Sequence, residues 1–330
     1  MSKKDYHHLT YEDRCQIYAL NKRGISQAKI ASQIGVDRST IFRELRRNSG
    51  GKGYRYKQAH YKYLERREKA NSKKQKMCGI TAAIVEILLI SSQWSPEQIS
   101  GRMGLLCSEH KVSHQTIYRY IRKDKALGGF LYKELRHKGK KYNKRKSKDA
   151  GRGCIPDRVD ISKRPIIVDK KERIGDWEFD TIIGAKHKGA IVSMVDRASK
   201  LVKFIKVSGK NAEEVEKAII KRLEPIREYI HTCTADNGKE FANHLNISEV
   251  LGADFYFATP YCSWERGLNE HTNGLFRQYF PKGTFFEDIS DEDVLVVENL
   301  LNNRPRKELE FKTPLEVFNE KCIEYNKLVS

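Results

Sequence analysis

Apolar residues in the first fifty positions recur every three to four residues, in three short blocks. This spacing is the period of an amphipathic helix. Thr10, Ser26 and Asp37 each stand before a block and are residue types that cap helix N-termini. Gly24 closes the first block, and Gly35 makes a tight turn before the third. Three helices with a glycine turn before the last indicate a helix-turn-helix.

The third block, the predicted recognition helix, is apolar on one side and basic on the other. In a helix-turn-helix the first turns of this helix face base edges, and flanking basic residues contact phosphates. We therefore expect base contacts from Arg38, Ser39, Thr40 and Arg43, and phosphate contacts from Arg46 and Arg47. The alternative is an ordinary helical bundle with a basic outer face.

A second, weaker helix-turn-helix pattern follows between residues 95 and 122. Ser95 and Gln98 can form a capping box around Pro96, and Ser113 can cap a later helix. The stretch between them, residues 101–112, is longer than a tight turn requires. DNA contacts are expected from the first turns of the later helix, at His114, Gln115, Thr116 and Arg119. Residues 80–90 read as a core helix, and residues 54–76 as a polar helix lying over the DNA backbone.

The second half of the chain changes from helical spacing to short apolar runs separated by polar turns. Runs of this kind, four to eight residues long, predict strands. We expect strands at 175–183, 189–195, 201–207, 231–235 and 254–257, and helices at 212–223, around Glu270, and at 290–302. Such an order predicts a mixed-sheet α/β layer structure.

Charge is distributed unevenly along the 330 residues. Residues 1–150 contain 35 Lys and Arg against 13 Asp and Glu, whereas residues 151–330 contain 28 against 30. Basic side chains displace the counterions condensed on phosphates, so the first half is expected to bind a polyanion. The alternative is a solvated surface that serves only solubility.

The seven cysteines are odd in number and show no Cys-x-x-Cys spacing. This argues against a disulfide framework or a zinc knuckle, and predicts reduced thiols in a cytoplasmic protein. The sequence lacks a signal peptide and any apolar run long enough to cross a bilayer, so no membrane partner is expected.

Three carboxylates stand in contexts that suit a shared metal site. Asp180 interrupts an apolar run, Asp236 ends another, and Glu270 lies in a helix-like stretch. A carboxylate in a strand is costly to bury without a partner, and converging carboxylates hold divalent metal over a phosphodiester. Each residue alone is more simply a hydrogen-bonded structural Asp, a turn, or a solvated Glu.

The predicted helix around Glu270 carries a polar stripe at helical spacing, formed by Arg266, Glu270, Asn273 and Arg277. Such a stripe could present Glu270 to metal. Its other members, Arg266, Asn273 and Arg277, are then expected to contact DNA phosphate.

Five segments together resemble the DDE transposases of bacterial insertion sequences, specifically the IS-thirty family. These segments are residues 175–184, 235–241, 260–283, 303–307 and 312–314. In addition, 33 residues separate Asp236 from Glu270, as in that family. The resemblance covers nearly the whole chain, including the helix-turn-helix.

The resemblance implies a fold and a chemistry. The fold would be α/β, with an N-terminal all-helical helix-turn-helix region followed by a ribonuclease-H-like, integrase-like catalytic core. Asp180, Asp236 and Glu270 would bind two Mg²⁺ or Mn²⁺ ions, without a covalent protein–DNA intermediate. Glu178 could be a supporting ligand, and Glu240 and Asp196 are weaker rivals.

The implied function is transposition: binding of the element's terminal inverted repeats, strand cleavage, and strand transfer into target DNA. Synapsis of two ends predicts a homo-oligomer on DNA in the bacterial nucleoid. Alternatives are a non-catalytic regulator derived from a transposase, and a serine or tyrosine recombinase. The predicted parts are 1–50 (helix-turn-helix), 51–135 (second DNA-binding region), 136–155 (basic linker), 156–320 (catalytic core) and 321–330 (tail).

Overall fold

The computed structural model describes residues 8–72, 77, 79–136, 155–260 and 262–329. The chain divides into two compact units, Met1–Cys78 and Gly79–Ser330, and each is described here by itself. The predicted basic linker lies almost wholly at 137–154, outside the described residues.

The first unit contains four helices: α1 (Tyr11–Lys22), α2 (Gln27–Ile34), α3 (Arg38–Asn48) and α4 (Tyr56–Ser72). Thr10 and Asp13 form a reciprocal capping box at α1. Gly35 ends α2 with a φ of 78°, a left-handed conformation that glycine adopts at little cost. Ile17, Ile30 and Ile41 are fully buried between the first three helices. The predicted helix-turn-helix is therefore confirmed.

Helix α4 belongs to this first unit, because it packs on both α1 and α3. Ala59 on α4 and Tyr54 before it are buried in the same core as Ile41. The boundary expected at residue 50 thus falls inside the first unit, which extends to Cys78. The helical periodicity of α4 is weak, so its packing against α1 was not visible in the pattern.

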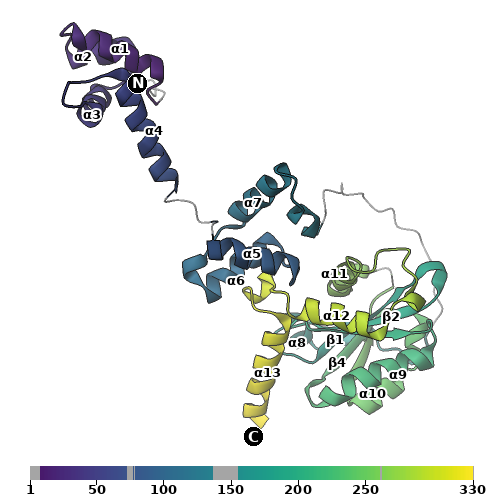
Figure 1. The fold of residues 1–330 in the computed structure, drawn as a ribbon. Helices are drawn as coiled ribbons and strands as arrows, with labels where there is room; N and C mark the ends of the chain where they lie inside the picture. Colours follow the sequence, from purple (N-terminus) through teal and green to yellow (C-terminus); the bar gives the residue numbers. More distant parts are fainter. Residues whose placement is uncertain (1–7, 73–76, 78, 137–154, 261, 330) are drawn as a thin grey trace. The chain divides into compact units, whose positions relative to one another are not determined.

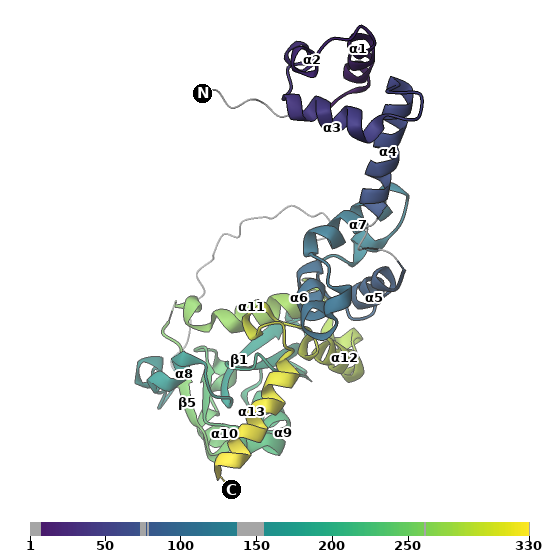
Figure 2. The same ribbon diagram turned by 90° about the vertical axis from the view of Figure 1, so that its left-hand side faces the viewer.

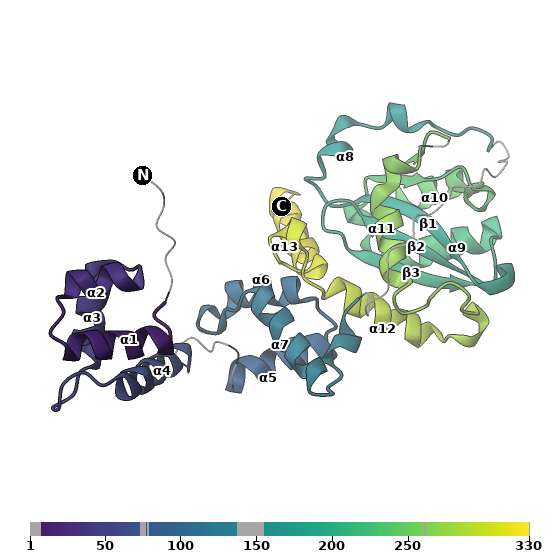
Figure 3. The same cartoon turned by 90° about the horizontal axis from the view of Figure 1, so that it is seen from above.

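The second unit begins with a helical segment: α5 (Gly79–Ile90), α6 (Pro96–Leu106) and α7 (His114–Ala126). Figure 3 shows these helices beside the sheet. Ser95 and Gln98 form the expected capping box, and Ser113 caps α7 through the Thr116 amide. The long spacer between the predicted helices is partly helix itself, since α6 continues to Leu106.

The rest of the second unit is built on a five-stranded mixed sheet in the order β3-β2-β1-β4-β5. The first three strands are antiparallel, and β4 and β5 run parallel to β1. The strands are β1 (Asp176–Ile183), β2 (Ala190–Asp196), β3 (Val202–Val207), β4 (Thr232–Ala235) and β5 (Asp254–Phe257). All five lie within one residue of the predicted bounds, and the expected mixed-sheet α/β fold is confirmed.

Helices cover both faces of this sheet (Figures 1 and 2). The helices are α8 (Ile166–Lys170), α9 (Ala212–Leu223), α10 (His244–Leu251), α11 (Gly267–Phe276), α12 (Asp291–Asn302) and α13 (Pro314–Val329). One hydrophobic core joins Trp177 and Phe179 of β1 to α9, α10 and Phe318 of α13. The other core joins Ile182 of β1 to Phe276 of α11 and Val297 of α12.

The C-terminal part of the chain attaches the helical segment of the second unit to the sheet. The Phe311 ring lies so close to α6 that a Cβ at Gly101 would be 2.2 Å from it. Arg102 on α6 forms an ion pair with Glu316. Helix α13 runs across the boundary predicted at residue 321. None of the described helices is long and apolar enough to cross a membrane.

Candidate active site

Asp180 and Asp236 come together because β1 and β4 are parallel neighbours. Glu178 of β1 is paired in register with Thr234 of β4. Two residues further along, Asp180 on β1 and Asp236, the residue that follows β4, therefore stand level with each other. Both side chains are partly buried, with 21% of each exposed.

Helix α11 and its preceding turn hold these two carboxylates from one side. Arg266 Nη2 lies 3.4 Å from an Asp236 carboxylate oxygen, and Nη1 lies 3.9 Å from Asp180. The Asn273 amide donates a 2.8 Å hydrogen bond to Asp180 and accepts one from Ser193 on β2. The two aspartates are thus fixed by one cation and one amide from the same polar stripe.

The pKa of the Asp180 carboxyl is set by burial and by two neighbouring charges of opposite sign. Desolvation raises the pKa of its carboxyl, the nearby Arg266 guanidinium lowers it, and the Asp236 carboxylate raises it again. The net shift is upward. Backbone amides of Thr181 and Gly238 donate to Asp180 and Asp236 respectively, each at 2.9 Å. A site of this kind favours a bound cation, because a cation relieves the repulsion between two partly desolvated acids.

Glu270 lies on the same face of α11 as Arg266 and Asn273, one helical turn from each, and is exposed. Across the described residues, no three His, Cys, Asp or Glu side chains form a set able to hold a metal ion. The structure therefore brings Asp180 and Asp236 together. It places Glu270 on the adjoining face of α11, where it does not form a three-residue metal-binding group with them.

The rival acids have other partners. Glu178 is buried and forms an ion pair with Arg197. Asp196 accepts hydrogen bonds from the Gly175 and Ser199 amides at a turn. Burial opposes ionisation of Glu240, but hydrogen bonds from Lys210 and Thr181 outweigh it and lower its pKa.

Of the predicted DNA contacts, those on α3 and α7 are mostly exposed, whereas those on α11 are bonded within the protein. Arg43 donates to the Ser39 hydroxyl and backbone carbonyl. Arg277 donates to the Ile183 carbonyl and stacks on the Phe286 ring at 5.2 Å. The side chains that remain open to solvent are Arg38, Ser39, Arg43, Arg46, Arg47, His114, Gln115 and Arg119, with Thr40 and Thr116 partly buried.

Ser193 is a supporting residue that the sequence reasoning missed. Its register partner on β1 is Asp180, and its hydroxyl donates to Asn273 at 2.9 Å. The available signal was a single serine within the apolar run of residues 190–195.

The comparisons with known proteins agree with the helix-turn-helix. A family model described as a helix-turn-helix domain matches residues 5–48. The chain is 47% identical over 315 residues to the transposase for insertion sequence element IS4351 of Bacteroides fragilis, covering 95% of this chain and 96% of that protein. It is 34% identical over 330 residues to transposase InsI for element IS30A of Escherichia coli, covering 96% of this chain and 84% of that protein.

Among solved structures, the chain is similar to the catalytic core domain of BIV integrase. The TM-score is 0.38 and the identity 21%, over 47% of this chain and 98% of that one. The high identity to transposases over nearly the full length does not favour a purely regulatory protein. The chain therefore belongs to the insertion-sequence transposase family that includes the transposases of IS4351 and IS30A.

Proposed function

We propose that this transposase acts by a DDE mechanism in which Asp180, Asp236 and Glu270 bind two Mg²⁺ or Mn²⁺ ions. The observation that supports this most directly is the juxtaposition of Asp180 and Asp236 under the Arg266 guanidinium. In the protein without metal, the Arg266 guanidinium already supplies positive charge to these two neighbouring carboxylates.

The donor set fits a hard divalent cation. Carboxylate oxygens are the ligands that Mg²⁺ prefers, and soft thiolate or imidazole groups are absent from the described contacts of both aspartates. Glu270 would add a third carboxylate from the same face of α11 that already contacts Asp180 through Asn273. When bound, the metal would activate the attacking oxygen and stabilise the leaving oxygen of an in-line displacement at phosphorus.

The protein's own groups would position and polarise this site. Asn273, held by Ser193, fixes the orientation of the Asp180 carboxylate. Arg266 offsets part of the charge of the two aspartates in the protein without metal, and would be free to contact a DNA phosphate once metal takes over that role. Water or a DNA 3′-hydroxyl would be the nucleophile, so no side chain forms a bond to DNA.

DNA recognition is proposed for the first unit. The exposed polar side chains at the start of α3 would contact base edges of the element's terminal inverted repeats, and Arg46 and Arg47 the phosphates. Helix α7 would add a second contact region through His114, Gln115, Thr116 and Arg119. Joining of two ends would require a homo-oligomer on DNA, in the cytoplasm of a bacterial cell.

The test is a cleavage and strand-transfer assay on DNA that carries the element ends. Native protein is compared with Asp180→Asn, Asp236→Asn and Glu270→Gln, with Mg²⁺, Mn²⁺ or a chelator. A matched control is Glu249→Gln, which removes an exposed carboxylate on α10. The three site variants should bind the ends with native affinity, yet form no 3′-hydroxyl products.

Each result decides one part of the proposal. Cutting by any one variant removes that residue from the acid set. Products in the presence of chelator exclude the metal mechanism. A covalent protein–DNA adduct on denaturing gels would instead indicate a recombinase with a side-chain nucleophile.

A further inference from the structure

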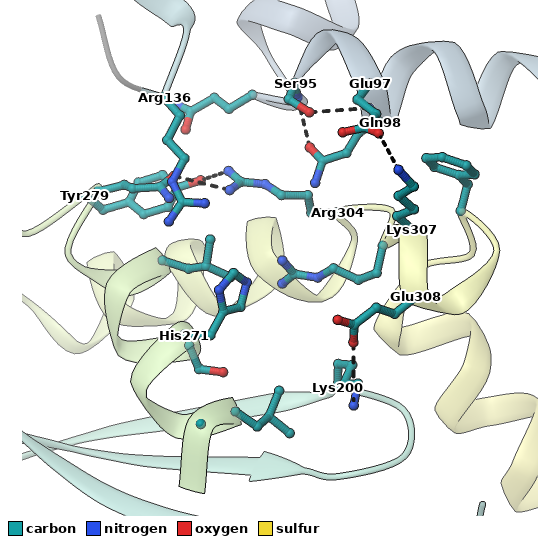
Figure 4. A pocket seen from close by; sticks show the side chains of 18 of the residues that line it. Ser95, Glu97, Gln98, Arg136, Lys200, His271, Tyr279, Arg304, Lys307 and Glu308 are labelled. Carbon is teal, nitrogen blue, oxygen red and sulfur yellow. Dashed lines mark hydrogen bonds and ion pairs between the residues drawn. The ribbon is translucent and has the colours of Figure 1, made fainter. Parts of the chain in front are cut away.

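A cavity of about 700 Å³ lies in the second unit between the helical segment and the sheet (Figure 4). Its walls come from the start of α6, the residues after η2 (Leu131–Glu134), one face of α11, and the turn after α12. The lining contains eight Lys and Arg side chains against five Glu, so the cavity is positively charged.

All three guanidinium groups of Arg136, Arg304 and Arg306 lack an ion pair with a carboxylate among the described residues, as do the ammonium groups of Lys133 and Lys171. The remaining three basic groups do have partners: Arg197 pairs with Glu178, Lys307 pairs with Glu97 at 2.9 Å, and Lys200 lies 3.9 Å from Glu308. The unpaired charge therefore includes three guanidinium groups, from Arg136, Arg304 and Arg306. Figure 4 shows Arg136 and Arg304 near Tyr279, above His271.

Arg304 is buried and Arg306 is partly buried. Arg304 is 5% exposed, and its only described side-chain partners are the neutral groups of Gln278 and Tyr279. Arg306 donates to the Leu301 carbonyl at 3.2 Å. The Nε atoms of Arg304 and Arg306 are buried without a hydrogen-bond partner. Buried charge without a counter-ion is costly, so this arrangement indicates that an anion is missing.

The pKa of Arg306 agrees with a positive potential in the cavity. Burial and then repulsion from Arg304 and Arg136 lower the pKa of Arg306 to about 10. An anion between these side chains would reverse this shift.

We propose that this cavity is a second phosphate-binding site. It would bind a backbone phosphate of the DNA strand at some distance from the carboxylates during strand cleavage and transfer. This inference rests on the proposed function. Guanidinium groups favour phosphate because their planar N–H pairs match its oxygens. The position of α11 favours a DNA strand as the source of that phosphate. One face of α11 contacts Asp180 through Asn273, and His271 on a neighbouring face lines the cavity.

The spacing is compatible with one strand contacting both sites. An α-helix with its side chains is about 10–12 Å in diameter. Phosphates of one strand are about 3.4 Å apart along the duplex axis. A strand crossing α11 would thus place a phosphate in the cavity a few nucleotides from the one at the carboxylates.

The experiment measures how the affinity of the full chain for end-bearing duplex depends on salt concentration. The variants are Arg306→Gln, and Arg136→Gln, which changes an exposed side chain and leaves the core intact. The matched control is Arg227→Gln, an exposed arginine outside the cavity. Each cavity variant should reduce the slope of log affinity against log salt by about 1, and the control should leave it unchanged. Arg306→Lys should restore part of the slope.

A second arm adds inorganic phosphate and follows the melting temperature. If phosphate stabilises the native chain but not Arg306→Gln, while all salt slopes are equal, the cavity binds free phosphate and the DNA-strand proposal is wrong. Equal slopes without a phosphate effect overturn the site altogether. Cleavage by the native chain in the same preparation shows that the proposed function holds in either case, so the two failures are distinguishable.

Discussion

Arg266 and Asp236 form an ion pair of 3.4 Å in the candidate active site. The same guanidinium reaches Asp180 at 3.9 Å, so one cation serves two acids that stand level on adjacent strands. Arg266 also donates to the Phe179 carbonyl at 3.0 Å, which anchors it to β1. In the protein without metal, the arginine therefore supplies part of the positive charge that a divalent ion would bring to this site.

Arg266→Gln should destabilise the metal-free protein. Without the guanidinium the two carboxylates repel each other, and because both are partly exposed we expect a loss of about 1–2 kcal/mol. Thermal unfolding in a chelator would show this as a lower melting temperature than for Arg227→Gln. Mg²⁺ should raise the melting temperature of Arg266→Gln more than that of the native chain. Identical melting temperatures in the chelator would mean that Arg266 does not neutralise the pair.

Arg43→Ala should weaken binding to element ends more than to random DNA. Arg43 is exposed on α3 and lies one turn after Ser39, whose hydroxyl it contacts at 2.9 Å. A base contact is worth about 1–3 kcal/mol of discrimination. Competitive binding on the two DNAs would measure the difference, with Arg23→Ala, outside α3, as the control. An equal loss on both DNAs would make Arg43 a phosphate contact.

Sequence patterns predicted the sheet well, because each strand is a short apolar run bounded by polar turns. They also predicted the helix-turn-helix, since Thr10, Ser26 and Asp37 stand at the three N-caps. Helix α10 was not predicted: its buried apolar residues Ile247 and Leu251 span a single turn, too short for a period to be recognised.

The candidate site was predicted only in part, because its charges are balanced by tertiary contacts. The spacing of Asp180 and Asp236 along the chain does not reveal that Arg266 lies between them. Likewise, Arg304 is buried although it stands in a short basic run, residues 304–307. The packing of the turn after α12 against α6 and α11 determines this burial.

Glu44→Gln should lower the free energy of unfolding of the first unit. Glu44 accepts a 2.9 Å hydrogen bond from Arg14 and another from the Tyr54 hydroxyl, and Arg14 and Glu44 are both buried. Breaking a buried ion pair leaves an uncompensated charge and typically costs about 3–5 kcal/mol. Amide hydrogen exchange in α1 and α3 should become about a hundredfold faster or more. The double variant Arg14→Met with Glu44→Leu should be closer to native, and exchange unaffected by Glu44→Gln would contradict the role of the pair.

The contribution of Asp196 to stability should fall as pH rises from about 4 to about 6. Burial raises the pKa of this carboxyl to about 6, although hydrogen bonds from Ser199 and Gly175 lower it. An unfolded Asp titrates near about 3.9. The folded state therefore binds more protons in this window, and the free energy of unfolding declines with pH through it. In urea unfolding, the advantage of the native chain over Asp196→Asn should shrink between pH 4.5 and 6.5; parallel pH profiles would contradict the shift.

Removal of residues 1–78 should leave a folded second unit that cuts DNA without selecting the element ends. The cut is placed at 78 and not at 50, because α4 packs on α1 and α3 and would be left without its partners. The isolated unit, residues 79–330, should unfold cooperatively and keep metal-dependent nicking of random duplex. Its affinity for ends and for random DNA should be equal within error. A matched fragment beginning at residue 51 should expose the face of α4 around Ala59 and aggregate. If residues 79–330 still prefer the element ends, α7 is the region that recognises them, and α3 contributes only backbone contacts.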